Sequence, residues 1–382
     1  MSWDVVEQFA LTGIGSFAKA GTKLFGAART GIQTSTDNGA SWTFEPFSNG
    51  AFSFSSNGST IYLGSKSKVF KSTDFGASWI DVSTGLGKGG IQALLYDGST
   101  VFAGTPADAV GICRSTNGGQ NWEPAAAGLP IASEIRSMIA FGGYVFAGTQ
   151  GDGIYRSSDH GDTWAKTDVN NPLLAQALVL TFCAKDNNLF AGAINGIYKS
   201  TDGGATFQRT LDGFPPNINV AALSLTVSNG NILAGVNVSF SPSEGLDAIF
   251  YSSDDGSNWH QANVPAQVVS VPAVASDGSS RAYGAVITTS SFTTGLYTST
   301  NAGVNWIART DVLMVDLERL AVNGSNVLAS TLFTAFYSTD FGETWGSSTP
   351  GFCPPFGCGV ATYTLRGHVD IRWKHCGHVL IH

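Results

Sequence analysis

The stretch SSDHGDTW at residues 157–164 belongs to a pattern, Ser-x-Asp-x-Gly-x-x-Trp, that occurs eight times in this chain of 382 residues. The first serines of successive copies are 37, 43, 42, 43, 52, 47 and 39 residues apart. A regular period of about 40 residues indicates stacked or radially arranged units, each too small to bury a core alone. The copies are STDNGASW (35–42), STDFGASW (72–79), STNGGQNW (115–122), SSDHGDTW (157–164), STDGGATF (200–207), SSDDGSNW (252–259), STNAGVNW (299–306) and STDFGETW (338–345).

Short apolar runs precede every copy, and they predict β-strands. Examples are VFAGT at 101–105, followed by GICRS, and YVFAGT at 144–149, followed by GIYRS. These runs are rich in β-branched and aromatic residues and are bounded by Gly, Asn, Asp and Ser, as strands are. A third run lies further upstream, and the pattern leads into a fourth strand. Four strands per period predict an all-β fold, a single β-propeller of four-stranded blades. We expect eight blades, with seven blades and a distorted unit as the alternative.

The pattern has the chemistry of a chain reversal between the third and fourth strands. An Asp side chain accepts hydrogen bonds from backbone N–H groups a residue or two ahead, and Gly supplies a positive φ. The Trp is expected to lock the hairpin against its own sheet. Asn replaces Asp in two copies, so we expect that the acceptor oxygen matters more than the charge. The expected structural positions are Asp37, Asp74, Asn117, Asp159, Asp202, Asp254, Asn301 and Asp340, with Trp42, Trp79, Trp122, Trp164, Trp259, Trp306 and Trp345.

This pattern resembles the Asp-box, or BNR repeat, of sialidases, xyloglucan-type glycosidases, sortilin-type receptors and photosystem assembly factors. The chain particularly resembles secreted or surface-attached bacterial proteins built of LFAGT…GIYRSTDGGxSW units, over roughly residues 10 to 350. The resemblance implies a propeller and a place outside the cell or on its surface. It implies little about activity, because the same box is found in enzymes and non-enzymes alike.

Composition narrows the classes of partner. The net charge of −8 and the pI near 5.1 argue against nucleic acid and anionic membranes. No apolar run approaches the roughly 20 residues of a membrane span, and no signal peptide is visible at the N-terminus, which leaves the cytoplasm as an alternative location. We predict no cofactor and no metal.

Two regions are expected, namely a propeller over 1–350 and a Cys- and His-rich tail over 351–382, where the repeat ends. We expect the tail to be poorly ordered. A zinc site or a small disulfide loop between Cys353 and Cys358 are the alternatives. Cys113 and Cys183, by contrast, fall in predicted strands and are expected to be buried.

Loops that vary between repeats indicate where a binding surface would lie. The box turns hardly vary, whereas the loops at 237–248, 288–295 and 211–218 are long, so blades five to seven are the expected recognition surface. Candidate contacts in these loops are three aromatic and two acidic residues, and two charged residues lie near innermost strands. These candidate ligand-binding residues are Phe214, Phe240, Phe292, Glu244, Asp247, Arg136 and Asp316.

No motif indicates catalysis. A glycosidase needs two carboxylates at a defined separation, and no spacing selects a pair among the 28 acidic residues. The Arg-containing segment expected of a sialidase is also missing. The chain is therefore predicted to be a non-catalytic module that recognises a glycan or a protein partner. A sialidase- or xyloglucanase-like glycoside hydrolase and an assembly-factor-like scaffold are the alternatives.

Overall fold

The computed structural model describes most of residues 14–348. Outside the described residues lie 1–13, 29–30, 37–42, 48–49, 57–59, 87–88, 92, 106–110, 132, 168–170, 216–219, 238–248, 266–267, 277, 289–293, 310–316, 332–334 and 349–382. The prediction of a disordered tail over 351–382 therefore lies outside the described residues.

The described residues form thirty-two strands, and we call each set of four consecutive strands a repeat. Repeats 1 to 4 comprise β1 (Ile14–Ala20), β2 (Lys23–Ala28), β3 (Gly31–Ser35), β4 (Thr43–Pro46); β5 (Ser53–Ser56), β6 (Ile61–Gly64), β7 (Val69–Ser72), β8 (Ile80–Asp81); β9 (Ala93–Tyr96), β10 (Val101–Gly104), β11 (Ile112–Ser115), β12 (Glu123–Pro124); and β13 (Ile135–Phe141), β14 (Tyr144–Thr149), β15 (Ile154–Ser157), β16 (Ala165–Lys166).

The second half of the chain continues the same order after one short 3-10 helix, η1 (Leu174–Gln176). Repeats 5 to 8 comprise β17 (Val179–Lys185), β18 (Asn188–Ala193), β19 (Gly196–Ser200), β20 (Gln208–Arg209); β21 (Ala221–Ser228), β22 (Asn231–Asn237), β23 (Ile249–Ser252), β24 (His260–Gln261); β25 (Val268–Ser276), β26 (Ala282–Thr288), β27 (Thr294–Ser299), β28 (Ile307–Ala308); and β29 (Leu317–Asn323), β30 (Asn326–Thr331), β31 (Ala335–Ser338), β32 (Gly346–Ser348).

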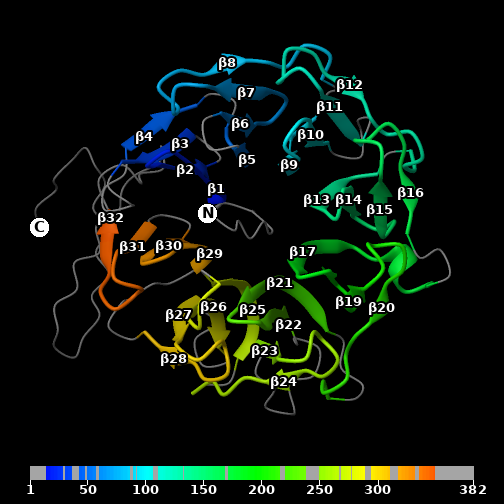
Figure 1. Ribbon diagram of the computed structural model, residues 1–382. Helices are drawn as coiled ribbons and strands as arrows, with labels where there is room; N and C mark the ends of the chain where they lie inside the picture. Colours follow the sequence, from blue (N-terminus) through cyan, green and yellow to red (C-terminus); the bar gives the residue numbers. More distant parts are fainter. Residues whose placement is uncertain are drawn as a thin grey trace, which may run out of the picture.

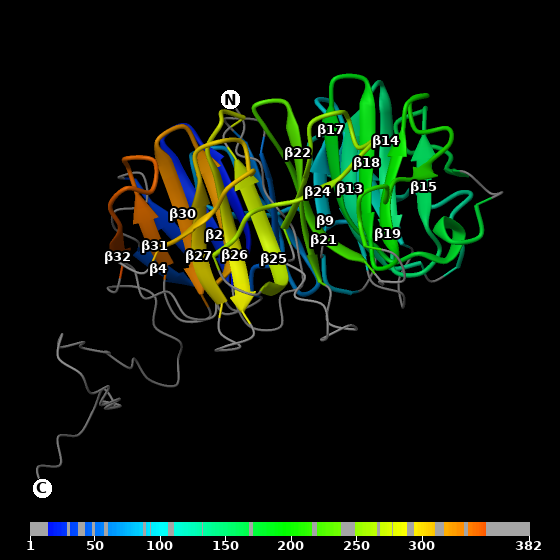
Figure 2. The ribbon, with the colours of Figure 1, turned by 90° about the horizontal axis from the view of Figure 1, so that it is seen from below.

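The repeats are arranged as a closed ring, which confirms the predicted all-β propeller. Within each repeat the strands pair antiparallel in chain order, with the first strand innermost and the fourth at the outer rim (Figure 1). Each innermost strand contacts the innermost strand of the next repeat, and β29 contacts β1. Seen from the side, the sheets lie next to one another around the axis of the ring (Figure 2).

The number of separate sheets differs from the expected eight. Six sheets have four strands each, but repeats 6 and 7 share one eight-stranded sheet. The two halves of this sheet are joined through β22 and β25, where Asn237 pairs with Ser270. Because of this connection, the part of the chain that the structure describes does not divide into eight separate four-stranded sheets.

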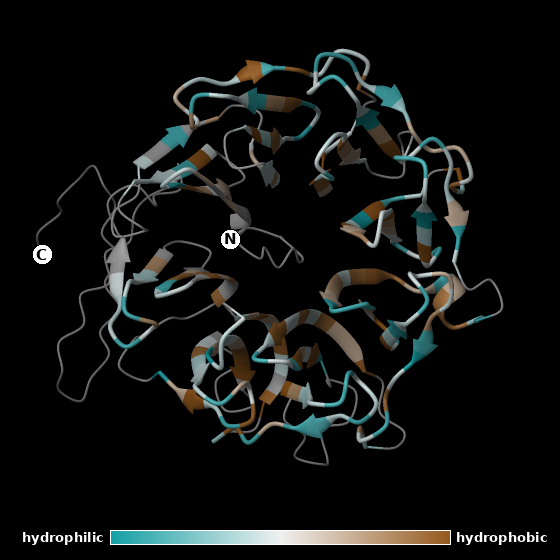
Figure 3. Ribbon diagram, in the orientation of Figure 1, coloured by the Kyte–Doolittle hydropathy of each residue, from teal (hydrophilic) through white to brown (hydrophobic). Residues whose placement is uncertain are grey.

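The apolar runs of the sequence become the core of the ring. The second strand of a repeat is buried on both of its faces, because its sheet is packed between two neighbouring sheets; β10 and most of β14 are examples. Figure 3 shows hydrophobic residues on inner and middle strands and hydrophilic residues on the outer strands β12, β20 and β24. Cys113 and Cys183 are buried in this core, as predicted.

Glycine in the FAG sequence of the second strand allows the next sheet to approach. A Cβ atom on Gly148 would lie 2.8 Å from the side chain of Val179, which is on the innermost strand of the next repeat. A Cβ on Gly235 would lie 2.6 Å from the carbonyl oxygen of Val271, again one repeat further. Any larger residue would push the second strand away from the innermost strand of the next repeat.

The antiparallel order gives the ring two different faces. Turns between the first and second strands, and the Asp-box turns between the third and fourth, lie at what we call the box face. Loops between the second and third strands, and connections from the fourth strand to the next repeat, lie at the opposite end of the strands, which we call the loop face. The box turns and the longer loops therefore lie on opposite faces of the ring.

Candidate functional site

The Asp-box turns share one hydrogen-bond network, seen clearly in repeat 4. The Ser157 hydroxyl donates to Asp159 Oδ1 over 2.7 Å and accepts from the Gly161 N–H at 2.7 Å. The backbone N–H of Thr163 donates to Asp159 Oδ1 at 2.9 Å and the Thr163 hydroxyl donates to Asp159 Oδ2 at 2.6 Å. The carboxylate therefore binds the residue four positions ahead, not one or two as predicted, and the serine holds the glycine.

These hydrogen bonds hold the box carboxylates in their ionised form. The side-chain hydrogen bond from Thr163 is the largest cause that lowers the pKa of Asp159 to about 2, followed by the Thr163 backbone N–H. The pKa values of Asp74, Asp254 and Asp340 fall to about 2 for the same kind of reason. At Asp202 desolvation raises the pKa, but the hydrogen bonds from Thr206 outweigh it and the result is again about 2. Such carboxylates accept hydrogen bonds and cannot act as general acids near neutral pH.

The two asparagine boxes make the same turn without a charge. Asn117 Oδ1 accepts from the Ser115 hydroxyl at 2.9 Å and from the Asn121 N–H at 3.0 Å. Asn301 Oδ1 accepts from the Asn305 N–H at 2.9 Å. The oxygen occupies the position of the carboxylate oxygen in the other boxes, as expected from the sequence.

Trp164 connects neighbouring repeats, whereas the indole N–H groups of Trp306 and Trp345 donate to carbonyl oxygens of their own boxes. The prediction that each Trp locks its own hairpin is therefore correct only for some copies. The backbone N–H of Trp164 donates to the carbonyl oxygen of Ala127 at 2.8 Å, and its indole N–H donates to that of Ala125 at 2.7 Å. Both acceptors follow β12 of the preceding repeat. Its ring also packs edge-on against Phe102 of that repeat, with ring centroids 6.4 Å apart. Spacing within one copy of the motif could not indicate a contact with another copy.

Two independent constraints, the backbone conformation and the space for a Cβ atom, require glycine in the box. Gly204 has φ +77°, as predicted, and a Cβ there would lie 2.1 Å from Cε1 of Phe146 in the preceding repeat. Gly161 stands in the same relation to Phe102. The residue before the glycine is also left-handed, even where it is Phe75 (φ 55°) or His160 (φ 52°). Sequence reasoning missed this second left-handed position because its side chains are so different.

Cations just before the box serine reach into the next box. Lys71 Nζ donates to the Gly118 carbonyl at 2.9 Å, Arg114 to that of His160 at 2.8 Å, and Arg156 to that of Gly203 at 3.1 Å. Recurrence of a cation at one repeat position was the signal in the sequence that could have predicted this contact. The box face is thus occupied by contacts that hold the ring together.

Most of the predicted ligand contacts cannot be placed. Phe240, Phe292, Glu244, Asp247 and Asp316 lie outside the described residues, as do Asp37 and Trp42 of the first box.

Phe214 lies within the described residues but faces inward. It is only 9% exposed and stacks on Phe250, with ring centroids 4.0 Å apart. It therefore contributes to the core of repeat 6 and is not an exposed ring at a loop tip.

Arg136 lies at the loop face, at the start of innermost strand β13. Its guanidinium contacts Glu134 Oε1 at 3.0 Å and donates to Gln150 Oε1 at 2.5 Å. The backbone N–H of Gln150 donates in turn to the Glu134 carbonyl oxygen at 2.9 Å. The three side chains form a polar group in which the arginine is about one quarter exposed.

Two short loop segments and two connections at this face are linked to one another by hydrogen bonds. Ser133 donates to Asp152 Oδ2 at 2.9 Å, the Gly153 N–H donates to the Ala177 carbonyl oxygen at 3.1 Å, and Asn195 Nδ2 donates to that of Leu173 at 2.8 Å. The segments 131–136, 149–153, 171–178 and 194–196 are therefore linked across repeats 4 and 5.

Three aliphatic side chains of these segments face solvent. Ile131 is fully exposed, Leu173 is 51% exposed and Ile194 is 43% exposed. Exposed aliphatic residues on linked surface segments that also carry polar groups are typical of surfaces that bind another molecule. We call Ile131, Glu134, Arg136, Gln150, Leu173 and Ile194 the loop-face patch.

Within the described residues, no group of three His, Cys, Asp or Glu side chains could hold a metal ion. No helix among them is long and apolar enough to cross a membrane.

Solved structures that resemble this chain share its fold at low sequence identity. The computationally designed protein Ika8 matches with a TM-score of 0.60 at 12% identity, covering 87% of this chain and 98% of its own. A GH74 xyloglucanase from Xanthomonas campestris matches with a TM-score of 0.55 at 15% identity, covering 93% and 70%. The extracellular domain of a one-component system from B. thetaiotaomicron matches with a TM-score of 0.55 at 14% identity, covering 88% and 40%.

Family models give a more specific result. No curated protein matches the chain. The BNR/Asp-box repeat model matches residues 336–345, the last copy of the motif. The model described as the DUF6242 beta propeller domain matches residues 84–331, well over half of the 382 residues. The chain therefore belongs to the DUF6242 β-propeller family and carries Asp-box repeats.

Proposed function

We propose that this propeller is a non-catalytic recognition module that binds a partner through its loop face. The observation that carries the proposal is the loop-face patch, where Ile131, Leu173 and Ile194 present aliphatic side chains to solvent. Exposing them without a partner is unfavourable, because each leaves apolar surface in water. Their position at one end of the strands makes the patch accessible to a large molecule.

The chemistry of the patch favours a protein partner over a glycan. The patch combines exposed aliphatic side chains with the polar group of Glu134, Arg136 and Gln150, in which the charges are already paired. An apolar surface around paired polar groups resembles the composition of protein interfaces. Sugar rings are instead usually held by aromatic faces, and none of the patch residues is aromatic.

The box face supports the proposal that this propeller is not an enzyme, because its carboxylates serve the structure. Its carboxylates are ionised and held by their own turns, with pKa values of about 2 at Asp159 and Asp340. A glycosidase needs a protonated acid near the working pH. A glycoside hydrolase remains the alternative, as for the GH74 xyloglucanase of the same fold, and its carboxylates would then lie elsewhere on the loop face.

Location and blade number belong to the proposal as well. We infer that the protein works outside the cell or on its surface, in line with the resemblance to secreted BNR proteins and with an extracellular domain among the similar structures. We also infer eight blades. The eight-stranded sheet would be two neighbouring blades whose strands β22 and β25 pair at Asn237 and Ser270, since the eight innermost strands follow one another around the ring.

A display experiment with matched variants tests the proposal. Random peptides are selected on the full-length protein, and their affinity is then measured for Leu173→Asp, Ile194→Asp and Ile307→Asp. Ile307 is 66% exposed on outer strand β28, far from the patch in the repeat order, and serves as the control. We expect the two loop-face variants to weaken binding about tenfold or more and the control to bind as the wild type does.

The same protein is applied to a glycan array with detection of released products. Peptide ligands that bind all variants equally would contradict a loop-face recognition site. Release of a sugar product would replace the proposal with the hydrolase alternative. Glycan binding that is lost in both loop-face variants would show that the patch recognises a glycan and not a protein.

A further inference from the structure

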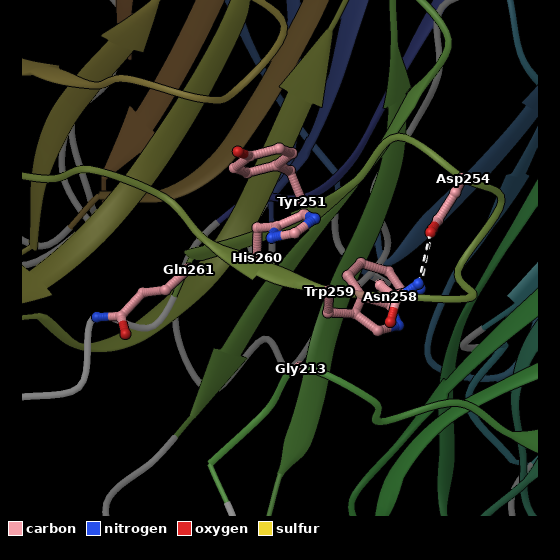
Figure 4. Close-up of a pocket in the computed structure, with 7 residues that line it drawn as sticks. All are labelled: Gly213, Tyr251, Asp254, Asn258, Trp259, His260 and Gln261. Atoms are coloured by element: carbon pink, nitrogen blue, oxygen red, sulfur yellow. Dashed lines mark hydrogen bonds between the residues drawn. The ribbon is translucent and has the colours of Figure 1, made fainter.

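A shallow depression of about 490 Å³ lies at the outer edge of repeat 6, away from the loop-face patch (Figure 4). Its lining includes Tyr251 of β23, His260 and Gln261 of β24, and Asn258 of the preceding box turn. The connection from repeat 5 closes one side, where Gly213 approaches the backbone of Trp259 so closely that a Cβ would meet its carbonyl oxygen.

Two aromatic rings stand on one face of the sheet in this depression. Tyr251 and His260 are directly opposite each other in the antiparallel pair β23–β24. Their ring centroids are 5.4 Å apart and their planes are inclined by 35°. Figure 4 shows the two rings one above the other, with the Gln261 side chain extending away from them.

Other repeats use this cross-strand position for contacts within the protein. In repeat 3 the corresponding pair is Arg114 and Glu123, which form an ion pair at 2.9 Å. In repeats 2 and 4 the first residue of the pair is Lys71 or Arg156, which donates to the next box turn. At this cross-strand position repeat 6 has two aromatic rings, whereas repeats 2, 3 and 4 have a cation that binds another group of the protein.

The polar groups of the depression remain available. Among the residues that the structure describes, none forms a hydrogen bond with the Tyr251 hydroxyl, the His260 ring or the Gln261 amide. The Asn258 amide donates to Asp254 Oδ2 at 2.8 Å, which leaves its carbonyl oxygen to accept another bond. The site thus offers two ring faces and several hydrogen-bond donors and acceptors to a ligand.

Neutral sugars match this combination of groups. The C–H face of a pyranose packs on aromatic rings, and its hydroxyl groups exchange hydrogen bonds with side-chain amides and phenols. The lining contains neither lysine nor arginine, so nothing there selects a carboxylated or sulfated sugar by an ion pair. We propose that the depression is a binding site for a short stretch of a neutral saccharide, separate from the loop-face patch and independent of its partner.

Saturation-transfer NMR on the full-length protein tests this site, because it detects the weak binding expected of an open, shallow surface. The probes are cellohexaose, maltohexaose and mannohexaose, each titrated to about 10 mM, a range suited to a Kd near 1 mM. Polygalacturonate serves as the anionic comparison. The ring C–H protons of the bound sugar should receive the strongest saturation if they lie on Tyr251 and His260.

Three exposed substitutions locate the binding. His260→Ala and Gln261→Ala each remove a group of the depression, and Gln208→Ala changes the corresponding first residue of β20 in repeat 5. All three positions are exposed on outer strands, so the variants should keep the melting temperature of the wild type. We expect the first two to raise the Kd about tenfold and Gln208→Ala to leave it unchanged.

The outcomes separate this site from the loop face. Loss of saccharide binding in His260→Ala with normal peptide binding supports the proposal, whatever happens at the loop-face patch. Failure of all three neutral probes to bind at about 10 mM would overturn it, as would equal binding by every variant. Preference for polygalacturonate would show that the site recognises charge, contrary to the proposal.

Discussion

The two faces of this ring use their side chains in opposite ways. On the box face the polar groups are paired with other groups of the protein, as in the Asp159 carboxylate that binds its own turn and the Arg156 guanidinium that binds the next one. On the loop face, Leu173 and Ile194 are directed into solvent although they are aliphatic. The contrast indicates that the repeated motif stabilises the ring at one end of the strands, whereas residues at the other end can bind a partner.

Removal of a box tryptophan should have the largest effect on stability. Trp164 is only 4% exposed and joins repeats 3 and 4 through two hydrogen bonds. We expect Trp164→Ala to lower the free energy of unfolding by about 4 kcal/mol, from the lost burial and the cavity between repeats. Chemical denaturation measures this change. A loss under about 1 kcal/mol would show that the tryptophan does not join the repeats.

Substitution of a box glycine should come next. Gly204→Ala would place a Cβ 2.1 Å from Cε1 of Phe146 at a left-handed φ, and we expect it to cost about 3 kcal/mol. Gly142→Ala is the matched control, since φ is +60° but nothing lies within 4 Å of the new Cβ. The control should cost about 1 kcal/mol, which is the price of the left-handed backbone alone. An equal loss of free energy of unfolding in the two variants would mean that the close approach between repeats does not affect stability.

Truncation of a box carboxylate should have a moderate effect. Asp159→Ala removes the acceptor for the Thr163 hydroxyl and N–H, and the exposure of the turn limits the expected cost to about 1 kcal/mol. Asp159→Asn should cost less than half of that, because Asn117 and Asn301 support the same turn. The melting temperatures of the wild type, Asp159→Ala and Asp159→Asn at pH 7 show the order of their stabilities. An Asn variant as unstable as the Ala variant would show that the charge is required.

Acid should remove the difference between wild type and Asp159→Asn. The folded-state pKa of Asp159 is about 2 and its ordinary value is 3.8, so ionisation stabilises the folded protein above pH 3.8 and that contribution is lost as the pH falls toward 2. The melting temperatures of the two proteins should therefore differ at pH 5 and converge near pH 2. A gap that stays constant over this range would contradict the depressed pKa.

Loop-face substitutions should have the smallest effect on stability. Leu173 is half exposed and its side chain contributes little to the core, so Leu173→Asp should change the free energy of unfolding by less than about 0.5 kcal/mol. Differential scanning calorimetry measures this directly. A drop as large as that of Asp159→Ala would mean that the patch is structural, and the contrast between the faces would disappear.

The spacing of the boxes predicted the propeller, and the amide oxygens of Asn117 and Asn301 predicted a turn that does not need a charge. Contacts between repeats could not be predicted in the same way. The partners of Trp164 and Gly204 are Ala125 and Phe146, which lie one repeat earlier, and a local motif carries no information about them. Phe214 shows the same limit at the candidate site, because a loop position does not reveal whether the ring stacks inward on Phe250.

The loop-face patch was harder to foresee than the box face. Arg136 stood out as a charge near an innermost strand, but Ile131, Leu173 and Ile194 are ordinary apolar residues whose exposure depends on how four segments meet. Those segments are held together by backbone acceptors such as the carbonyl oxygens of Glu134, Ala177 and Leu173. Every residue has a carbonyl, so no sequence pattern marks them.

The most direct test of the division between the faces compares Asp159→Ala with Leu173→Asp in two measurements, melting temperature and affinity for a peptide selected on the wild-type protein. We predict that Asp159→Ala lowers the melting temperature and keeps the affinity at 20 °C, whereas Leu173→Asp keeps the melting temperature and loses the affinity. The opposite pattern, with affinity lost in Asp159→Ala and kept in Leu173→Asp, would contradict the account.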